Sequence, residues 1–168
     1  MSIYTKTGDK LQTSTFNNTR VNKNDIIIDI NGNIDELQST VMVAYNFQSN
    51  EHIKNILLDI CKKLYSFWYA ISASKNIITE DDILYLESLI DQYYKNIPNL
   101  SDFVYPGLTK AASFIHVART VCRRAERVLI SYYLENPINE INLKYINRLS
   151  DLLYILALSV DEIKSIKD

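Results

Sequence analysis

Apolar residues recur at intervals of three and four through five long segments of this sequence, and this rhythm constrains the fold more than any other feature. The segments begin near Asn33, Glu51, Thr79, Lys110 and Asn142. The 168 residues include only three Gly and three Pro, too few for a turn-rich β-sandwich. The pattern predicts an all-α fold, a five-helix up-and-down bundle over about residues 33–166. We expect one domain over residues 1–168.

Capping signals mark two of the expected helix starts. Asn33 is a favourable N-cap, and Asp35 would then lie in the first turn, where a carboxylate suits the helix dipole. Thr79 followed by Asp82 predicts a capping box at the start of the third helix.

The first 25 residues are polar and lack a helical period, which is typical of an ordered loop or a flexible arm. Both interpretations stay open at this point. Residues 26–30 form a β-branched run, for which we expect a brief strand or an extended lead-in to the first helix.

The charge balance argues against a general attraction to nucleic acid or to an anionic membrane. Eighteen basic residues face twenty acidic ones, so an anion must be held by a local cluster. The first residues lack the apolar core of a secretory signal, and the apolar run at 152–160 is far shorter than the about 20 residues of a membrane span. We expect a cytoplasmic protein in which Cys61 and Cys122 are buried free thiols.

The fourth helix carries an arginine stripe, defined here as the residues opposite its apolar side: His116, Arg119, Arg123, Glu126 and Arg127. Arg124 lies apart from both sides on the helical wheel. A solvated charged surface is the ordinary interpretation of such a stripe. However, three arginines spaced by four residues repel one another, and the guanidinium fork matches phosphate or carboxylate oxygens in pairs. The stripe therefore predicts an anionic partner.

Two sources of negative charge fit the stripe. Asp35 and Glu36 can offer a carboxylate to one arginine, which leaves the others for a polyphosphate. Glu126, one turn along, can hold a Mg²⁺ ion that itself lies on the phosphates.

The N-terminal arm concentrates hydroxyl groups, a cation and a glycine in five consecutive residues, namely Thr5, Lys6, Thr7, Gly8 and Asp9. Such a segment can wrap phosphates with side-chain and backbone donors. It is not a Walker A loop, because the glycine spacing and the Lys-Ser/Thr pair of that loop are missing.

Several motifs in one order resemble the corrinoid adenosyltransferases of the propanediol-utilisation and human mitochondrial type. They are IYTKTGDK, Arg20-Val21, IDEL at 34–37, the PG at Pro106, HVARTVCRRAER at 116–127 and NRLSDLL at 147–153. The resemblance covers nearly the whole chain, and HVARTVCRRAER together with YTKTGD is its most specific part.

The resemblance implies a function. Members of this family attach the 5′-deoxyadenosyl group of ATP to the cobalt of reduced cobalamin, with release of triphosphate. It implies that the arm residues Thr5 to Asp9 and Lys23 wrap ATP, with Arg127 on the phosphates, Glu126 on Mg²⁺ and Asn147 near the adenosine. Together with Arg119, these residues form the expected ATP site.

The resemblance also implies an assembly, a homotrimer with active sites between subunits. Asp35 would form an intersubunit ion pair with Arg123, and we assign Asp35, Arg123 and Arg127 to catalysis. Phe103 and Tyr105 are candidates for facing the corrinoid. The chemistry further implies a flavoprotein cobalamin reductase and an adenosylcobalamin-dependent enzyme as partners.

The arm departs from the family pattern GDKGTTSLFGG. Leu11, Gln12, Asn17 and Asn18 replace glycines and their neighbours, and Leu108 stands where a second glycine usually follows PG. Asparagine tolerates positive φ, whereas we expect Leu11 not to adopt it readily. Either the loop takes a variant path or its affinity for ATP is reduced.

Two alternatives to adenosyl transfer stay open. The chain can be a non-catalytic paralogue that binds ATP or corrinoid, or a helical module that binds a partner or nucleic acid through the stripe.

Overall fold

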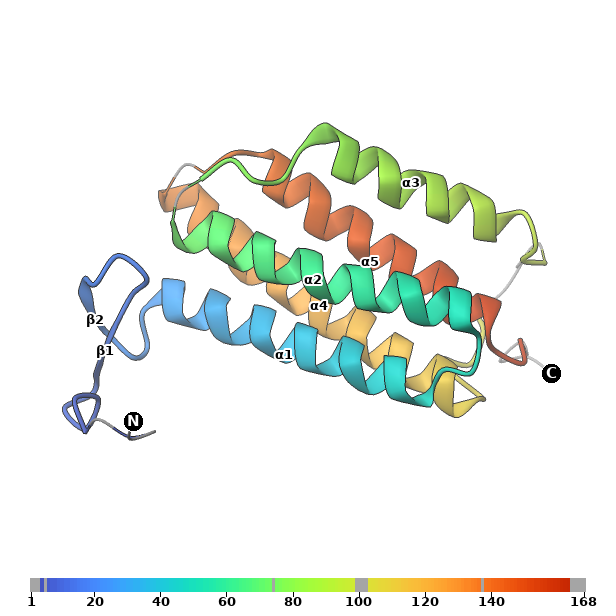
Figure 1. Ribbon diagram of the computed structural model, residues 1–168, viewed down its shortest axis with the longest axis horizontal. Helices are drawn as coiled ribbons and strands as arrows, with labels where there is room; N and C mark the ends of the chain where they lie inside the picture. Colours follow the sequence, from blue (N-terminus) through green and yellow to red (C-terminus); the bar gives the residue numbers. More distant parts are fainter. Residues whose placement is uncertain (1–3, 5, 74, 99–102, 137, 164–168) are drawn as a thin grey trace.

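The computed structural model describes residue 4 and residues 6–73, 75–98, 103–136 and 138–163. Within these ranges a two-stranded hairpin precedes five α-helices. The elements are β1 Gln12–Ser14, β2 Arg20–Asn22, α1 Ile26–Phe47, α2 Glu51–Ser72, α3 Glu80–Tyr94, α4 Lys110–Glu135 and α5 Ile141–Ser159. Successive helices run in opposite directions (Figure 1), so the expected all-α five-helix bundle is confirmed.

Helix α4 packs against α1 on one side and α5 on the other, while α2 packs on α1 and α3 on α5. The rings of Phe67 and Tyr145, both fully buried, stack with centroids 5.7 Å apart between α2 and α5. Each large apolar side chain buried in this way contributes about 1.5–3 kcal/mol. The packing leaves an outward face on α4, on which Arg123 and Arg127 are exposed.

The first helix begins earlier than the sequence predicts. Residues 26–30 are its first turns, not a strand, and Asp25 is the N-cap, whose carboxylate accepts a hydrogen bond from the Ile27 N–H over 3.1 Å. The β-branched run is helical because Ile30, Ile34 and other residues at the same spacing enter the core, and this packing overrides a weak strand preference. Asp35 therefore lies in the middle of α1, and the expected dipole interaction there was wrong.

The starts of α2 to α5 lie within two residues of the predicted ones, whereas α5 ends at Ser159, short of the predicted end of the bundle near residue 166. The capping box of α3 is confirmed: Thr79 Oγ1 accepts from the Asp82 N–H, and the Asp82 carboxylate accepts from the Thr79 N–H. Asp82 also pairs with Lys63 of α2 over 2.6 Å, so the start of α3 is tied to its neighbour.

The polar arm is ordered as an antiparallel hairpin in which Thr13 lies opposite Val21. Its turn carries Phe16, whose ring meets the edges of Trp68 and Tyr69 at centroid distances of 6.0 and 5.0 Å. The arm therefore lies at the end of the bundle where α1 begins, against α2 (Figure 1).

Both cysteines are free thiols, as expected, but only Cys122 is fully buried, whereas Cys61 is partly exposed. Burial raises the pKa of the Cys122 thiol, so it stays protonated. In the described part of the chain, no helix has the length and apolar character needed to cross a membrane.

Candidate functional site

Arg123 and Arg127 form the exposed part of the arginine stripe, one turn apart on α4. Nη1 of Arg127 donates a hydrogen bond to the Arg123 carbonyl oxygen over 3.1 Å, which lays the guanidinium along its own helix. Among the described residues, Arg124 is the arginine of α4 that forms an ion pair within the chain. The positive charge of Arg123 and Arg127 is therefore left for a ligand or a second chain.

Glu126 and Asn147 are brought together from α4 and α5. The amide nitrogen of Asn147 donates to a carboxylate oxygen of Glu126 over 2.8 Å. The residue predicted to hold a metal and the residue predicted near the adenosine are therefore direct neighbours, beside the two exposed arginines. The hydrogen bond orients the carboxylate and leaves its other oxygen for a cation.

His116 was wrongly placed on the exposed stripe. Its side chain is only 4% exposed and lies beside Tyr154 of α5, with ring centroids 6.1 Å apart. Within the described chain neither ring nitrogen has a hydrogen-bond partner. Burial lowers the pKa of His116, and the neighbouring Arg119 charge lowers it further. The wheel gives the direction of a side chain from its helix axis but not the neighbouring helix that covers it.

Arg119 also turns toward α5. The centre of its guanidinium lies 5.7 Å from the centroid of the Tyr154 ring, a cation–π geometry. Its Nε is buried without a hydrogen-bond partner among the described residues. Arg119 therefore marks the edge of the stripe, whereas Arg123 and Arg127 occupy the outward face.

Arg124 joins α4 to α1, a role that the sequence pattern did not predict. Its Nε donates to the Asn33 side-chain oxygen over 2.9 Å, and its Nη2 pairs with Glu36 of α1. We expected Asp35 or Glu36 to offer a carboxylate to an arginine of the stripe. Glu36 does pair with an arginine of α4, but this arginine is Arg124, which lies outside the stripe. The signal in the sequence was Asn33 and Glu36, three residues apart on one face of α1.

Asp35 is exposed and lines a cleft of about 540 Å³ between the arm, α1 and α2. Thr13 of the arm and Trp68 of α2 also line this cleft. Arg123 is not among the residues that line it, and the structure does not bring Asp35 and Arg123 together within one described chain.

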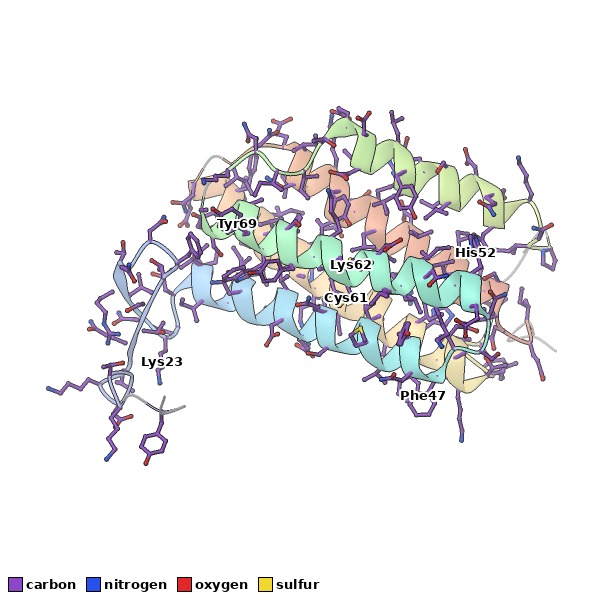
Figure 2. All side chains as sticks on the ribbon, in the orientation of Figure 1. Lys23, Phe47, His52, Cys61, Lys62 and Tyr69 are labelled. Atoms are coloured by element: carbon purple, nitrogen blue, oxygen red, sulfur yellow. The ribbon has the colours of Figure 1, made fainter. Side chains whose placement is uncertain are left out.

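The arm places two of its predicted ATP-binding residues side by side. A Cβ at Gly8 would lie 3.3 Å from Nζ of Lys23, so the Lys23 ammonium lies over the Gly8 backbone. Figure 2 shows Lys23 on the arm, outside the helical bundle. Arg20 donates to the Thr7 carbonyl oxygen over 2.9 Å and steadies the same turn. Lys6 and Asp9 are exposed in this turn, while Thr5 lies outside the described residues.

Leu11 adopts a φ of 62°, in the left-handed region, contrary to the expectation that it would not. The Leu11 carbonyl oxygen accepts a hydrogen bond from the Lys23 N–H over 2.9 Å, which helps to hold this strained conformation. Asn18 takes a φ of 58° in the hairpin turn, as its side chain permits. The arm therefore keeps a closed shape without the family's glycines.

The arm and the exposed arginines lie on different faces of one chain. Among the described residues, no hydrogen bond or ion pair joins the arm to α4. The arm rests on α2 through Phe16, whereas Arg123 and Arg127 lie on the outward face of α4.

Phe103 and Tyr105, the corrinoid candidates, are exposed in the loop that leads into α4. Gly107 in this loop has a φ of 96°. A Cβ there would lie 2.5 Å from the Ser113 Cα, so only glycine fits.

Comparison with known proteins assigns this fold and these motifs to a family. The family model for cobalamin adenosyltransferase matches residues 3–160. The chain is 36% identical to the corrinoid adenosyltransferase of Bacillus subtilis, over 100% of this chain and 91% of that protein. It is also 36% identical to the corrinoid adenosyltransferase PduO of Citrobacter freundii over 96% of this chain. The chain spans about half the length of that PduO protein.

Solved structures agree. A variant of the PduO-type ATP:corrinoid adenosyltransferase from Lactobacillus reuteri, complexed with cobalamin and ATP, superposes with a TM-score of 0.89 at 34% identity, over 94% of this chain and 90% of that one. Another variant, complexed with ATP, gives a TM-score of 0.86 at 36% identity, over 93% and 92% of the two chains. Because the family model covers nearly the whole chain and the helical bundle superposes on solved members, this chain belongs to the cobalamin adenosyltransferase family.

Proposed function

We propose that this protein transfers the 5′-deoxyadenosyl group of ATP to the cobalt of reduced cobalamin, forming adenosylcobalamin and releasing triphosphate. The observation that carries this proposal is the pair of outward arginines on α4, Arg123 and Arg127, beside the Glu126–Asn147 hydrogen bond. Two findings described above support the same conclusion: the Bacillus subtilis relative is named for this activity, and the Lactobacillus reuteri variant was solved with cobalamin and ATP.

The reaction needs no nucleophile from the protein. Cobalt(I) of the corrinoid supplies the electron pair that forms the bond to C5′ of ATP, and the C5′–O bond breaks with its pair passing to the triphosphate. The protein must hold C5′ near the cobalt and neutralise charge on the departing oxygen. Arg127, with Arg123 one turn away, suits this task because a guanidinium donates in pairs to phosphate oxygens.

The arm residues are proposed to wrap the nucleotide. Lys23 over the Gly8 backbone offers an ammonium beside a turn without a side chain, so phosphates can approach closely. The remaining proposed contacts come from Thr5, Lys6, Thr7 and Asp9, with Asn147 toward the adenosine and Arg119 at the edge of the site.

A Mg²⁺ ion fits the donor set beside the arginines. Protein sites for Mg²⁺ on nucleotides commonly use one or two carboxylates and take the other ligands from phosphates and water. Glu126 supplies one carboxylate, oriented by Asn147. Within the described residues there is no cluster of three or more His, Cys, Asp or Glu side chains for a metal, so the ion would depend on the nucleotide. When bound, Mg²⁺ would neutralise part of the triphosphate charge.

A homotrimer with sites between subunits is proposed from the separation of the arm and the arginines. The arm of one chain would cover the outward face of α4 of its neighbour, where Asp35 of the first chain would meet Arg123 of the second. The cleft beside Asp35, lined by Trp68 and Thr13, offers room for such a contact.

The cellular setting is also proposed. The one-electron reduction to cobalt(I) needs a donor, for which a flavoprotein reductase is suited, and the product serves an adenosylcobalamin-dependent enzyme. Two free thiols, Cys61 and Cys122, support a reducing compartment such as the cytoplasm.

An anaerobic assay tests the proposal directly. Purified protein is mixed with ATP, Mg²⁺ and chemically reduced cobalamin, and the visible spectrum follows formation of the cobalt–carbon bond. Binding of ATP or corrinoid without a spectral change to adenosylcobalamin would instead indicate a non-catalytic paralogue. Thermal stabilisation by an oligonucleotide but not by ATP with Mg²⁺ would favour the nucleic-acid-binding alternative.

A further inference from the structure

The loop of residues 103–109 carries both proposed corrinoid-facing side chains and ends at Thr109, the N-cap of α4. Phe103 is 87% exposed and Tyr105 47%. Because both side chains are exposed, their positions follow the backbone of the loop. Ser113 Oγ donates to the Gly107 carbonyl oxygen over 2.9 Å and fixes the loop from inside α4.

A carboxylate from the far end of the chain fixes the same loop from outside. Oδ1 of Asp161, two residues after the end of α5, accepts hydrogen bonds from the backbone N–H groups of Leu108 and Thr109 over 2.8 and 2.9 Å. The first turn of α4 reads Lys-Ala-Ala-Ser and contains no acid. Asp161 therefore supplies the negative charge that an α-helix N-terminus favours.

The Thr109 hydroxyl completes the connection by acting as both acceptor and donor. It accepts from the Ala112 N–H over 3.2 Å as the N-cap of α4. It donates to the Val160 carbonyl oxygen over 3.1 Å, satisfying one of the carbonyl groups left open at the end of α5. Three hydrogen bonds thus join residues 108–109 to residues 160–161. We call these three hydrogen bonds the 160–161 latch.

We infer that Asp161 is a positioning residue for corrinoid binding, acting through the 160–161 latch to hold the 103–109 loop in the conformation that receives the corrinoid. The inference rests on the proposed function. Asp161 acts through the loop and not by contact with either substrate. Its role is to keep the loop from adopting other conformations, which would otherwise reduce the fraction of protein competent to bind.

The latch should affect the binding of the corrinoid and not the binding of ATP. Arg123 lies about 20 Å along α4 from Thr109, at about 1.5 Å per residue. Its neighbours Arg124 and Glu126 are held independently by Asn33 and Asn147. Loosening the latch should therefore impair the corrinoid side of the site while the ATP side remains intact. A general loss of folding would impair both.

Steady-state kinetics with each substrate varied in turn test this split. In Asp161→Ala the KM for reduced cobalamin is expected to rise about tenfold, since hydrogen bonds to a charged group are lost, while the KM for ATP changes less than about twofold. Asp161→Asn keeps an acceptor oxygen and is expected to recover most of the loss. Glu162→Ala removes an exposed acid one residue away and serves as the matched control, expected to behave like the parent protein.

Amide hydrogen exchange gives a readout that does not depend on activity. Exchange of the Leu108 and Thr109 amides should accelerate in Asp161→Ala and not in Glu162→Ala. Thr109→Val, which keeps the side-chain shape but removes the hydroxyl, should raise the KM for cobalamin in the same direction if Asp161→Ala does not fold.

The outcomes distinguish a failure of the positioning role from a failure of the proposed function. Equal increases in KM for both substrates, or an unchanged KM for cobalamin with accelerated exchange, would overturn the positioning role. A parent protein that fails to form adenosylcobalamin, but shows the expected exchange pattern, would overturn the proposed function and leave only a structural latch.

Discussion

Arg124 donates a hydrogen bond from Nε to the side-chain oxygen of Asn33 over 2.9 Å, which ties α4 to α1 between the two outward arginines. Asn33 is 7% exposed, and its amide nitrogen donates in turn to the Asp29 carboxylate and carbonyl oxygens, each over 2.8 Å. The Arg124–Asn33 hydrogen bond joins the two helices, and the Asn33–Asp29 hydrogen bonds within α1 hold the Asn33 amide in place. Together with the packing of α4 against α1 and α5, this contact helps to set the directions of Arg123 and Arg127.

We predict that Asn33→Ala lowers the free energy of unfolding by about 1–3 kcal/mol, because buried partners lose their hydrogen bonds. The Arg124–Glu36 ion pair adds little by itself, since both side chains are roughly half exposed. Urea unfolding measures the change, with Ser39→Ala on the exposed side of α1 as the control. A loss no larger than that of the control would show that the Asn33 network does not hold the two helices.

We predict that Arg127→Ala lowers the rate of adenosylation by about 100- to 1000-fold, because a preorganised donor to the leaving group is removed. Arg127→Lys keeps the charge but not the paired geometry and should retain an intermediate rate. Single-turnover spectra under anaerobic conditions measure both variants. An alanine variant with a rate near that of the parent would remove Arg127 from the proposed site.

We predict that Leu11→Gly strengthens ATP binding about fivefold. Leu11 holds a φ of 62°, a strain of about 1 kcal/mol that glycine does not carry. Leu11→Ala removes the same side chain but keeps the strain, so it separates backbone from contact effects. Calorimetric titration with ATP measures the Kd of each. Equal affinities for the glycine and alanine variants would mean that the loop conformation does not limit binding.

We predict that the buried His116 makes the protein less stable in mild acid. Burial and Arg119 lower its pKa below the ordinary 6.5, while Asp161 opposes them in part. The unfolded chain therefore binds the proton more readily than the folded one, and stability present above about pH 6.5 is lost as pH falls toward the folded pKa.

His116→Leu removes this contribution while filling the same space. Between about pH 7 and pH 5 the parent should lose more unfolding free energy than the leucine variant. His52, which is exposed, provides the matched control as His52→Leu. Parallel pH profiles for the parent and His116→Leu would contradict the assignment.

Sequence periodicity predicted the starts of α2 to α5 within two residues because their apolar stripes coincide with the core. Periodicity failed at the start of α1, because Asn33 is a plausible cap and the true cap is Asp25. The hydrogen bond of Asn33 with Arg124 explains why this buried polar residue lies in the middle of the helix. His116 shows the same limit, since a wheel does not say which neighbour covers a side chain. The outward arginines were predictable because repulsion between like charges needs no tertiary information.

We predict that Asp35 and Arg123 form an ion pair between two subunits of a homotrimer. Each is exposed in the single chain, and Asp35 lies beside a cleft that the rest of the chain leaves open. Sedimentation should show a trimer for the parent and partial dissociation for Asp35→Asn. Asp91→Asn removes an exposed acid of α3 and serves as the control. A stable and fully active monomer would contradict both the trimer and the shared site.

A double-mutant cycle decides whether the two side chains meet. Breaking a pair that is buried in the interface costs about 3–5 kcal/mol, whereas an exposed pair costs under about 1 kcal/mol. Because Asp35 lies in the middle of α1, no helix-end dipole opposes an arginine there. The exchange Asp35→Arg with Arg123→Asp should therefore restore most of the trimer lost in either single variant. A coupling energy near zero, with each single variant weakening the trimer independently, would place the two residues in separate contacts.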